Sequence, residues 1–84
     1  MKTKHETPCE MMARAIKLIE QEIKNKEHRI QTLTERLNKL QSQPNPDAAQ
    51  IREIKADIQE LEDQLETDRP QLDAFKEEFN ASCG

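Results

Sequence analysis

The 84-residue sequence contains no tryptophan and no tyrosine, and Phe75 and Phe79 are its two aromatic residues. Glycine occurs once, at Gly84, so the chain has no glycine-rich loop that could cradle a phosphate group. No segment approaches the roughly 18 consecutive apolar residues of a transmembrane helix, so no membrane partner is predicted. The chain also lacks the aromatic platforms on which single-stranded nucleic acids stack.

Charged residues, by contrast, make up 36% of the sequence and give it a formal net charge of -4. Residues 1–42 hold nine Lys and Arg against six Asp and Glu, a charge of +3, and residues 43–84 hold four against eleven, a charge of -7. A basic first half and an acidic second half favour pairing within the chain. Because glutamates interrupt the basic half and the net charge is acidic, nucleic acid is not an expected partner.

Two long segments show the 3,4 spacing of a heptad repeat, with one apolar face each. The first segment places these residues on that face: Cys9, Met12, Ile16, Ile19, Ile23, Lys26, Ile30, Leu33, Leu37 and Leu40. The second segment places these: Ile51, Ile54, Ile58, Leu61, Leu65, Asp68, Leu72, Phe75 and Phe79. We call these positions the seam. The pattern predicts an all-α fold, an antiparallel two-helix coiled-coil hairpin formed by residues 1–84.

The first helix is expected over about residues 8–42. Thr7 is a suitable N-cap with Pro8 after it, and Glu10 lies three residues later, where its carboxylate can bond back to the Thr7 backbone in a capping box. This signal, directly before the first seam residue, fixes the start of the helix.

Two prolines one residue apart, Pro44 and Pro46, predict a turn at residues 43–46. Asn45 is then the expected N-cap of a second helix over about residues 46–82. A connection this short makes neighbouring helices antiparallel.

Pro70 lies inside the second predicted helix. An interior proline removes one backbone hydrogen bond and clashes with the preceding turn, at a cost of about 3 kcal/mol. The seam stays in phase across Pro70, so we predict a continuous helix that is kinked near this residue.

Folding the seam at the turn sets Leu40 opposite Ile51 and Met12 opposite Phe79 in one uninterrupted register. The charged seam residues, Lys26 and Asp68, fall in adjacent layers and are predicted to meet. One interpretation is that this polar pair fixes the register, as single polar core residues do in coiled coils. The other is that Lys26 extends to solvent while Asp68 caps the helix at the Pro70 kink.

Charged residues that flank the seam are also expected to pair between the helices. The predicted pairs are Glu20 with Lys76, Glu27 with Arg69, and Arg36 with Asp57. Exposed pairs of this kind contribute only ~0.2–1 kcal/mol each. They therefore select the arrangement more than they stabilise it.

The register brings Cys9 and Cys83 to the end of the hairpin opposite the turn, which we call the open end. A disulfide is the first interpretation, and it predicts an oxidising compartment. Two free thiols, as in a cytoplasmic protein, are the second. The third is a redox or metal site that includes His5, although one histidine and two cysteines match no zinc spacing rule.

A second apolar stripe runs beside the seam near the open end. Its residues on the first helix are Met11, Ala15 and Leu18, and the second helix adds Ala74 and Ala81. These five residues, which we call the patch, either widen the hairpin core or form a contact surface. In the second case they dock a protein partner or join two hairpins as a homodimer in a four-helix bundle.

No catalytic residues, metal site or cofactor is predicted, because no nucleophile, base and acid converge in such a rod. The sequence therefore favours a non-enzymatic protein-protein interaction or assembly module, a stiff hairpin closed by Cys9 and Cys83. The alternative hypothesis is a redox-responsive or metal-binding small protein that acts through these two cysteines.

Overall fold

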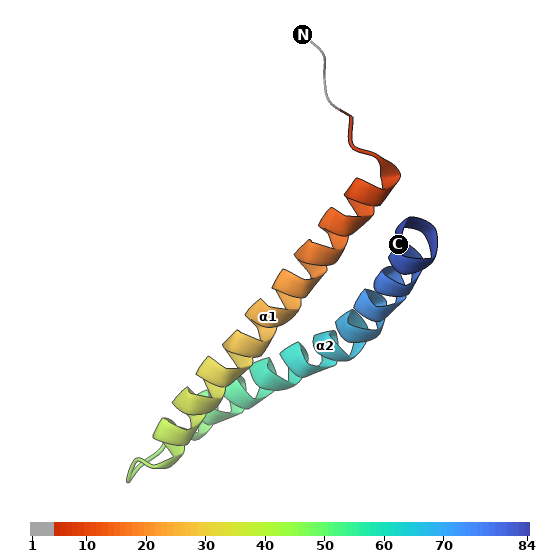
Figure 1. Cartoon of the computed structure of the whole chain (residues 1–84). Helices are drawn as coiled ribbons and strands as arrows, with labels where there is room; N and C mark the ends of the chain where they lie inside the picture. Colours follow the sequence, from red (N-terminus) through yellow and green to blue (C-terminus); the bar gives the residue numbers. More distant parts are fainter. Residues whose placement is uncertain (1–4) are drawn as a thin grey trace.

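The computed structural model describes residues 5–84 and contains two long antiparallel helices joined by a short turn (Figure 1). Helix α1 spans Pro8–Gln41 and helix α2 spans Ala48–Cys83. The molecule is elongated, with principal extents of 63 × 32 × 15 Å. The predicted all-α antiparallel hairpin is therefore confirmed.

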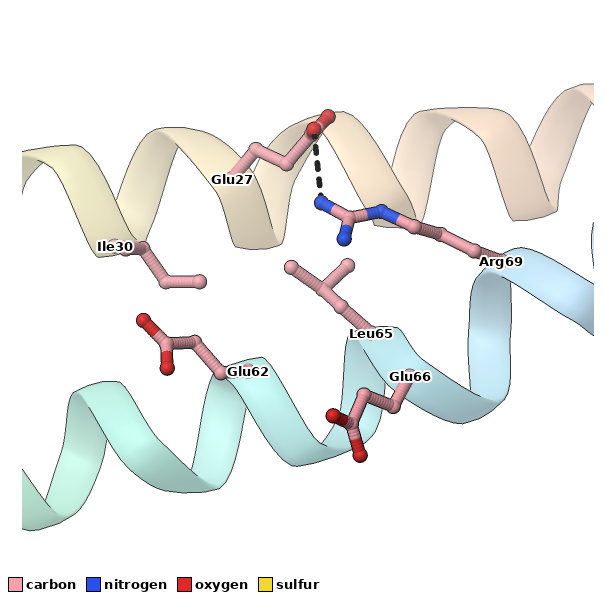
Figure 2. A pocket seen from close by; sticks show the side chains of 6 residues that line it. All are labelled: Glu27, Ile30, Glu62, Leu65, Glu66 and Arg69. Atoms are coloured by element: carbon pink, nitrogen blue, oxygen red, sulfur yellow. Dashed lines mark hydrogen bonds and ion pairs between the residues drawn. The ribbon is translucent and has the colours of Figure 1, made fainter.

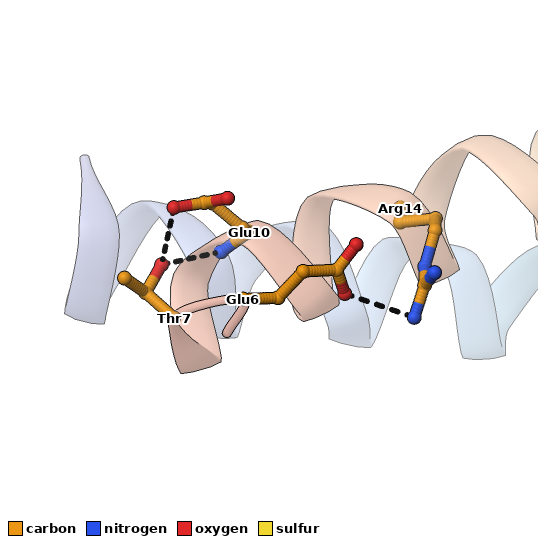
Figure 3. Close-up of polar contacts among 4 residues, drawn as sticks. All are labelled: Glu6, Thr7, Glu10 and Arg14. Atoms are coloured by element: carbon orange, nitrogen blue, oxygen red, sulfur yellow. Dashed lines mark hydrogen bonds and ion pairs between the residues drawn. The ribbon is translucent and has the colours of Figure 1, made fainter. Parts of the chain in front are cut away.

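Helix α1 begins at the predicted N-cap. Thr7 has extended backbone angles, and its hydroxyl oxygen accepts a hydrogen bond from the Glu10 N–H at 3.1 Å (Figure 3). The capping box predicted a bond from the Thr7 backbone to the Glu10 carboxylate. Instead, the Thr7 hydroxyl donates to that carboxylate at 3.2 Å. A hydroxyl both donates and accepts, so Thr7 and Glu10 join through it alone. An ion pair of 2.9 Å joins Glu6, which precedes the helix, to Arg14 in the second helical turn (Figure 3).

Helix α1 ends at Gln41 and is capped by Ser42, whose backbone N–H and hydroxyl both donate to the carbonyl of Asn38. The connection to α2 spans residues 42–47 and contains both prolines of the turn. The two bonds from Ser42 satisfy the Asn38 carbonyl, which has no partner within helix α1.

Helix α2 begins two residues later than predicted, and its N-cap is Asp47 rather than Asn45. The Asp47 carboxylate accepts from the N–H groups of Ala49 and Gln50 at 3.0 and 3.2 Å. The physical reason is charge: a carboxylate at this position binds two orphan N–H groups and also interacts favourably with the helix dipole, whereas the Asn45 amide is neutral.

Helix α2 runs without a break through Pro70 and ends at Cys83, so the proline bends the helix and does not divide it. Figure 1 shows α2 changing direction where its colour passes from cyan to blue, the region of Pro70. The predicted kink is thus present.

The core of the hairpin is the seam. Every seam residue is buried or half-buried, and nearly all other described residues are exposed. The most buried side chains are Leu65 at 2% exposure, Ile54 at 5%, and Ile16 and Ile23 at 8%. Two helices cover each other on one face only, so most seam residues keep some contact with water.

Candidate interaction surface

The open end of the hairpin is closed by a disulfide between Cys9 and Cys83, whose Cα atoms lie 5.8 Å apart. The two cysteines are separated by 74 positions, so the bond closes nearly the whole chain into one loop. Within residues 5–84 no cysteine is free, and no group of three or more His, Cys, Asp or Glu is placed to hold a metal ion. Both sulfurs are therefore occupied with each other, and His5 takes no part with them.

Lys26 and Asp68 meet across the seam, where the Lys26 ammonium donates to the Asp68 carboxylate. Their side chains are only 24% and 19% exposed. Asp68 makes no side-chain bond to a backbone N–H anywhere in residues 5–84, so it does not cap the helix at Pro70. The contact therefore agrees with the first interpretation, in which Lys26 and Asp68 pair across the seam, and not with the second, in which they point to different partners.

Two further ion pairs cross between the helices beside Lys26 and Asp68. Glu27 pairs with Arg69 and Glu20 pairs with Lys76, each at 3.3 Å. All four residues occupy heptad position e, directly after the second seam residue of each heptad, and e positions of antiparallel helices lie along one edge of the interface. We call this edge the ion-pair side.

We expect the Lys26–Asp68 pair to be coupled more strongly than its neighbour Glu27–Arg69. The Glu27 and Arg69 side chains are 50% and 55% exposed, so water screens their attraction, whereas the Lys26–Asp68 pair is largely shielded. Double-mutant cycles with alanine, measured by urea unfolding, should give about 1–3 kcal/mol for the first pair and at most about 1 kcal/mol for the second. Equal coupling energies would remove the argument that burial of Lys26 and Asp68 sets the register.

The third predicted pair, Arg36 with Asp57, is not among the ion pairs of residues 5–84. Both side chains are exposed, and both lie at heptad position g, on the edge opposite the ion-pair side. The sequence placed these residues at the same level of the rod but did not decide whether their side chains turn toward each other.

The patch lies on that same opposite edge, which we call the patch side. Met11 and Leu18 are the exposed large hydrophobic residues of the described chain, at 47% and 62% exposure. Ala15 is half-buried between them, and Ala74 and Ala81 are exposed on α2. Only Ala15 therefore widens the core, and the other four present apolar surface to solvent. Their heptad positions, c for these four and g for Ala15, explain why α2 does not cover them.

A shallow pocket of about 410 Å³ lies on the ion-pair side (Figure 2). Its lining residues are Glu27, Ile30, Glu62, Leu65, Glu66 and Arg69. Figure 2 shows the Arg69 guanidinium bonded to the Glu27 carboxylate, so these two charges offset each other. Across residues 5–84 no buried side-chain nitrogen or oxygen lacks a hydrogen-bond partner. The pocket thus offers carboxylates and one paired arginine, and no nucleophile with an adjacent base.

In the part of the chain that the structure describes, neither helix combines the length and the apolar character needed to cross a membrane. Comparison of this chain with protein-family models, with curated proteins and with solved structures finds no match.

Proposed function

We propose that this chain is a non-enzymatic protein-interaction or assembly module, whose contact surface is the patch at the open end. The observation that carries this proposal is the exposure of Met11 and Leu18, one heptad apart on the same face of α1. Single exposed apolar residues are ordinary on protein surfaces, but a stripe in register with a seam is what a packed helix presents to a neighbour.

Rigidity supports the same proposal. The disulfide fixes α1 and α2 at one end, the turn joins them at the other, and Lys26 with Asp68 ties them between these points. A surface held in this way loses little conformational entropy when it binds, which favours affinity. A stiff rod without an enclosed cleft suits such a role better than it suits catalysis.

A photo-reactive phenylalanine placed at Leu18 tests the proposal in cells that express the chain. We expect illumination to produce one discrete protein adduct, either with a second copy of the chain or with another protein. The same group at Lys24, which is exposed and lies at position b outside the patch, should give no such adduct. Introducing Met11→Glu beside the probe should abolish the adduct, because a charge would then enter the apolar contact.

Equal labelling from Leu18 and Lys24, or an adduct that survives Met11→Glu, would mean that the patch is not a specific contact surface. Circular dichroism of each variant checks that the hairpin remains folded, since Met11, Leu18 and Lys24 are all exposed.

A further inference from the structure

The two edges of the hairpin interface differ in a way that indicates what covers the patch side. On the ion-pair side, Glu20 and Glu27 bond across to Lys76 and Arg69, so this edge satisfies its own charges. On the patch side, residues 5–84 form no ion pair between the helices. The patch side is therefore the edge whose charged and apolar groups remain available.

Residues at the same level of the rod can be identified from the contacts between the helices. Cys9 is bonded to Cys83 and Lys26 is bonded to Asp68, so residues of the two helices whose sequence numbers add to between 92 and 94 lie within about one helical turn of each other along the rod. By this rule Met11 is level with Ala81, and Leu18 is level with Ala74. Each large apolar residue of α1 thus has a small one of α2 at its own level.

Charges on the patch side follow the same rule in the half of the rod nearer the turn. Arg36 is level with Asp57, and Lys39 is level with Glu53, and all four side chains are exposed. Between the apolar and the charged halves, Arg29 is level with Gln64. In this half of the edge the basic residues of α1 are level with acidic or neutral residues of α2, whereas nearer the open end Glu22 is level with Gln71 and Glu78 is level with Ala15.

A pocket of about 210 Å³ lies on this edge and is lined by Arg29, Asp57, Glu60, Leu61 and Gln64. The seam residue Leu61 is half-buried there, so a second apolar surface can reach the core of the hairpin at this point.

We propose that the patch side binds the patch side of a second copy of this chain, with the two-fold axis along the rod and both open ends together. Such a rotation lays α1 of one copy on α2 of the other, antiparallel and at the same level. Met11 and Leu18 then pack against Ala81 and Ala74 of the second copy, and Arg36 and Lys39 face its Asp57 and Glu53. The result is a four-helix bundle with an isologous interface.

The charge pattern argues against the opposite orientation over the full length of the rod. If the open end of one copy covered the turn end of the other, Met11 would lie near the level of Lys39 and Glu53, and Leu18 near the level of Arg29 and Glu60. Large apolar residues would then be buried against charges, which is unfavourable. The orientation with both open ends together is therefore the one that matches both halves of the patch side.

This inference rests on the proposed function, and sedimentation of the purified, oxidised protein tests it separately. We expect the mass to rise from 9.8 kDa to twice that value as the concentration increases to millimolar. Leu18→Glu should raise the dissociation constant about tenfold or more, as expected for a residue buried at an interface. Gln21→Glu, which adds the same charge at an exposed position outside the patch, should leave the constant unchanged.

Exchange of the large and small residues tests the predicted register. Leu18→Ala and Ala74→Leu should each weaken the dimer, the first by leaving a gap and the second by a clash. The double variant should restore the dimer to near the original constant, because leucine and alanine then face each other again. No other pairing of the two copies predicts this rescue.

A mass of 9.8 kDa at every concentration would overturn the inference, as would a dimer whose constant is unaffected by Leu18→Glu. If that monomer still gave a specific adduct from Leu18 in cells, the second copy would be ruled out as the partner while the proposed function stood. Loss of both the dimer and the adduct would overturn both.

Discussion

Removal of the disulfide, by replacing Cys9 and Cys83 with alanine, should lower the free energy of unfolding by about 4 kcal/mol. The bond joins residues 74 positions apart, so it greatly restricts the unfolded chain, and the chain-entropy model assigns more stabilisation to longer loops. Within residues 5–84 only four apolar side chains are buried, so the core is small and this loss is large in comparison. Chains this short commonly depend on a disulfide or on a partner for stability. We therefore expect the variant to lose much of its helix at room temperature, beginning at the open end.

Alkylation of intact protein before and after reduction establishes first that no thiol is free, and urea unfolding followed by circular dichroism gives the change in stability. The matched control is wild-type protein that has been reduced and reoxidised, which should recover its original midpoint. If the variant without the disulfide had the same urea midpoint as the oxidised wild-type protein, the seam alone would hold the hairpin together.

Reduction of the disulfide in the folded wild-type protein, followed by alkylation, separates the proposed function from its redox alternative. A protein that responds to redox conditions through Cys9 and Cys83 would exchange its disulfide with a dithiol at mild potentials while still folded. A structural disulfide resists reduction until strong reductant or denaturant is added. We expect the second behaviour, because both cysteines are only partly exposed and each lies at the end of a long helix.

Replacement of Pro70 with alanine should raise the free energy of unfolding by about 2–3 kcal/mol. The proline lies at an exposed position inside α2, where it leaves the carbonyl of the preceding turn without its helical hydrogen bond. Alanine restores that bond and fits the helix without strain. Part of the gain, about 0.4–1 kcal/mol, is offset because proline also restricts the unfolded chain.

Urea unfolding of Pro70→Ala measures this gain, with Glu77→Ala as the control. Glu77 occupies the same outward heptad position one repeat later, and its replacement should change stability by less than about 0.5 kcal/mol. A destabilised Pro70→Ala variant would mean that the bend is required to keep Phe75 and Phe79 against α1. The kink would then be part of the packing and not a tolerated defect.

Much of this architecture follows directly from the order of the residues. The 3,4 spacing from Cys9 to Leu40 and from Ile51 to Phe79 identifies the residues that lie between the helices, because a helix brings such positions onto one face. Once the turn is placed, that face permits one register, and the register brings Cys9 to Cys83 and Lys26 to Asp68. These contacts depend on backbone geometry that is nearly constant from helix to helix.

The remaining features were decided only by the tertiary structure, because they depend on where individual side chains turn. Among residues 5–84, Arg36 and Asp57 form no ion pair although Glu27 and Arg69 do. Exposure is the clearest case: Ala15 is half-buried while Met11 and Leu18 on the same stripe remain open. Periodicity placed these residues on one face and put Ala15, at position g, nearer to the seam than Met11 and Leu18 at position c, whereas the extent to which each is covered was set by how closely α2 approaches. That distance depends on side-chain packing across the seam, which no single helix encodes by itself.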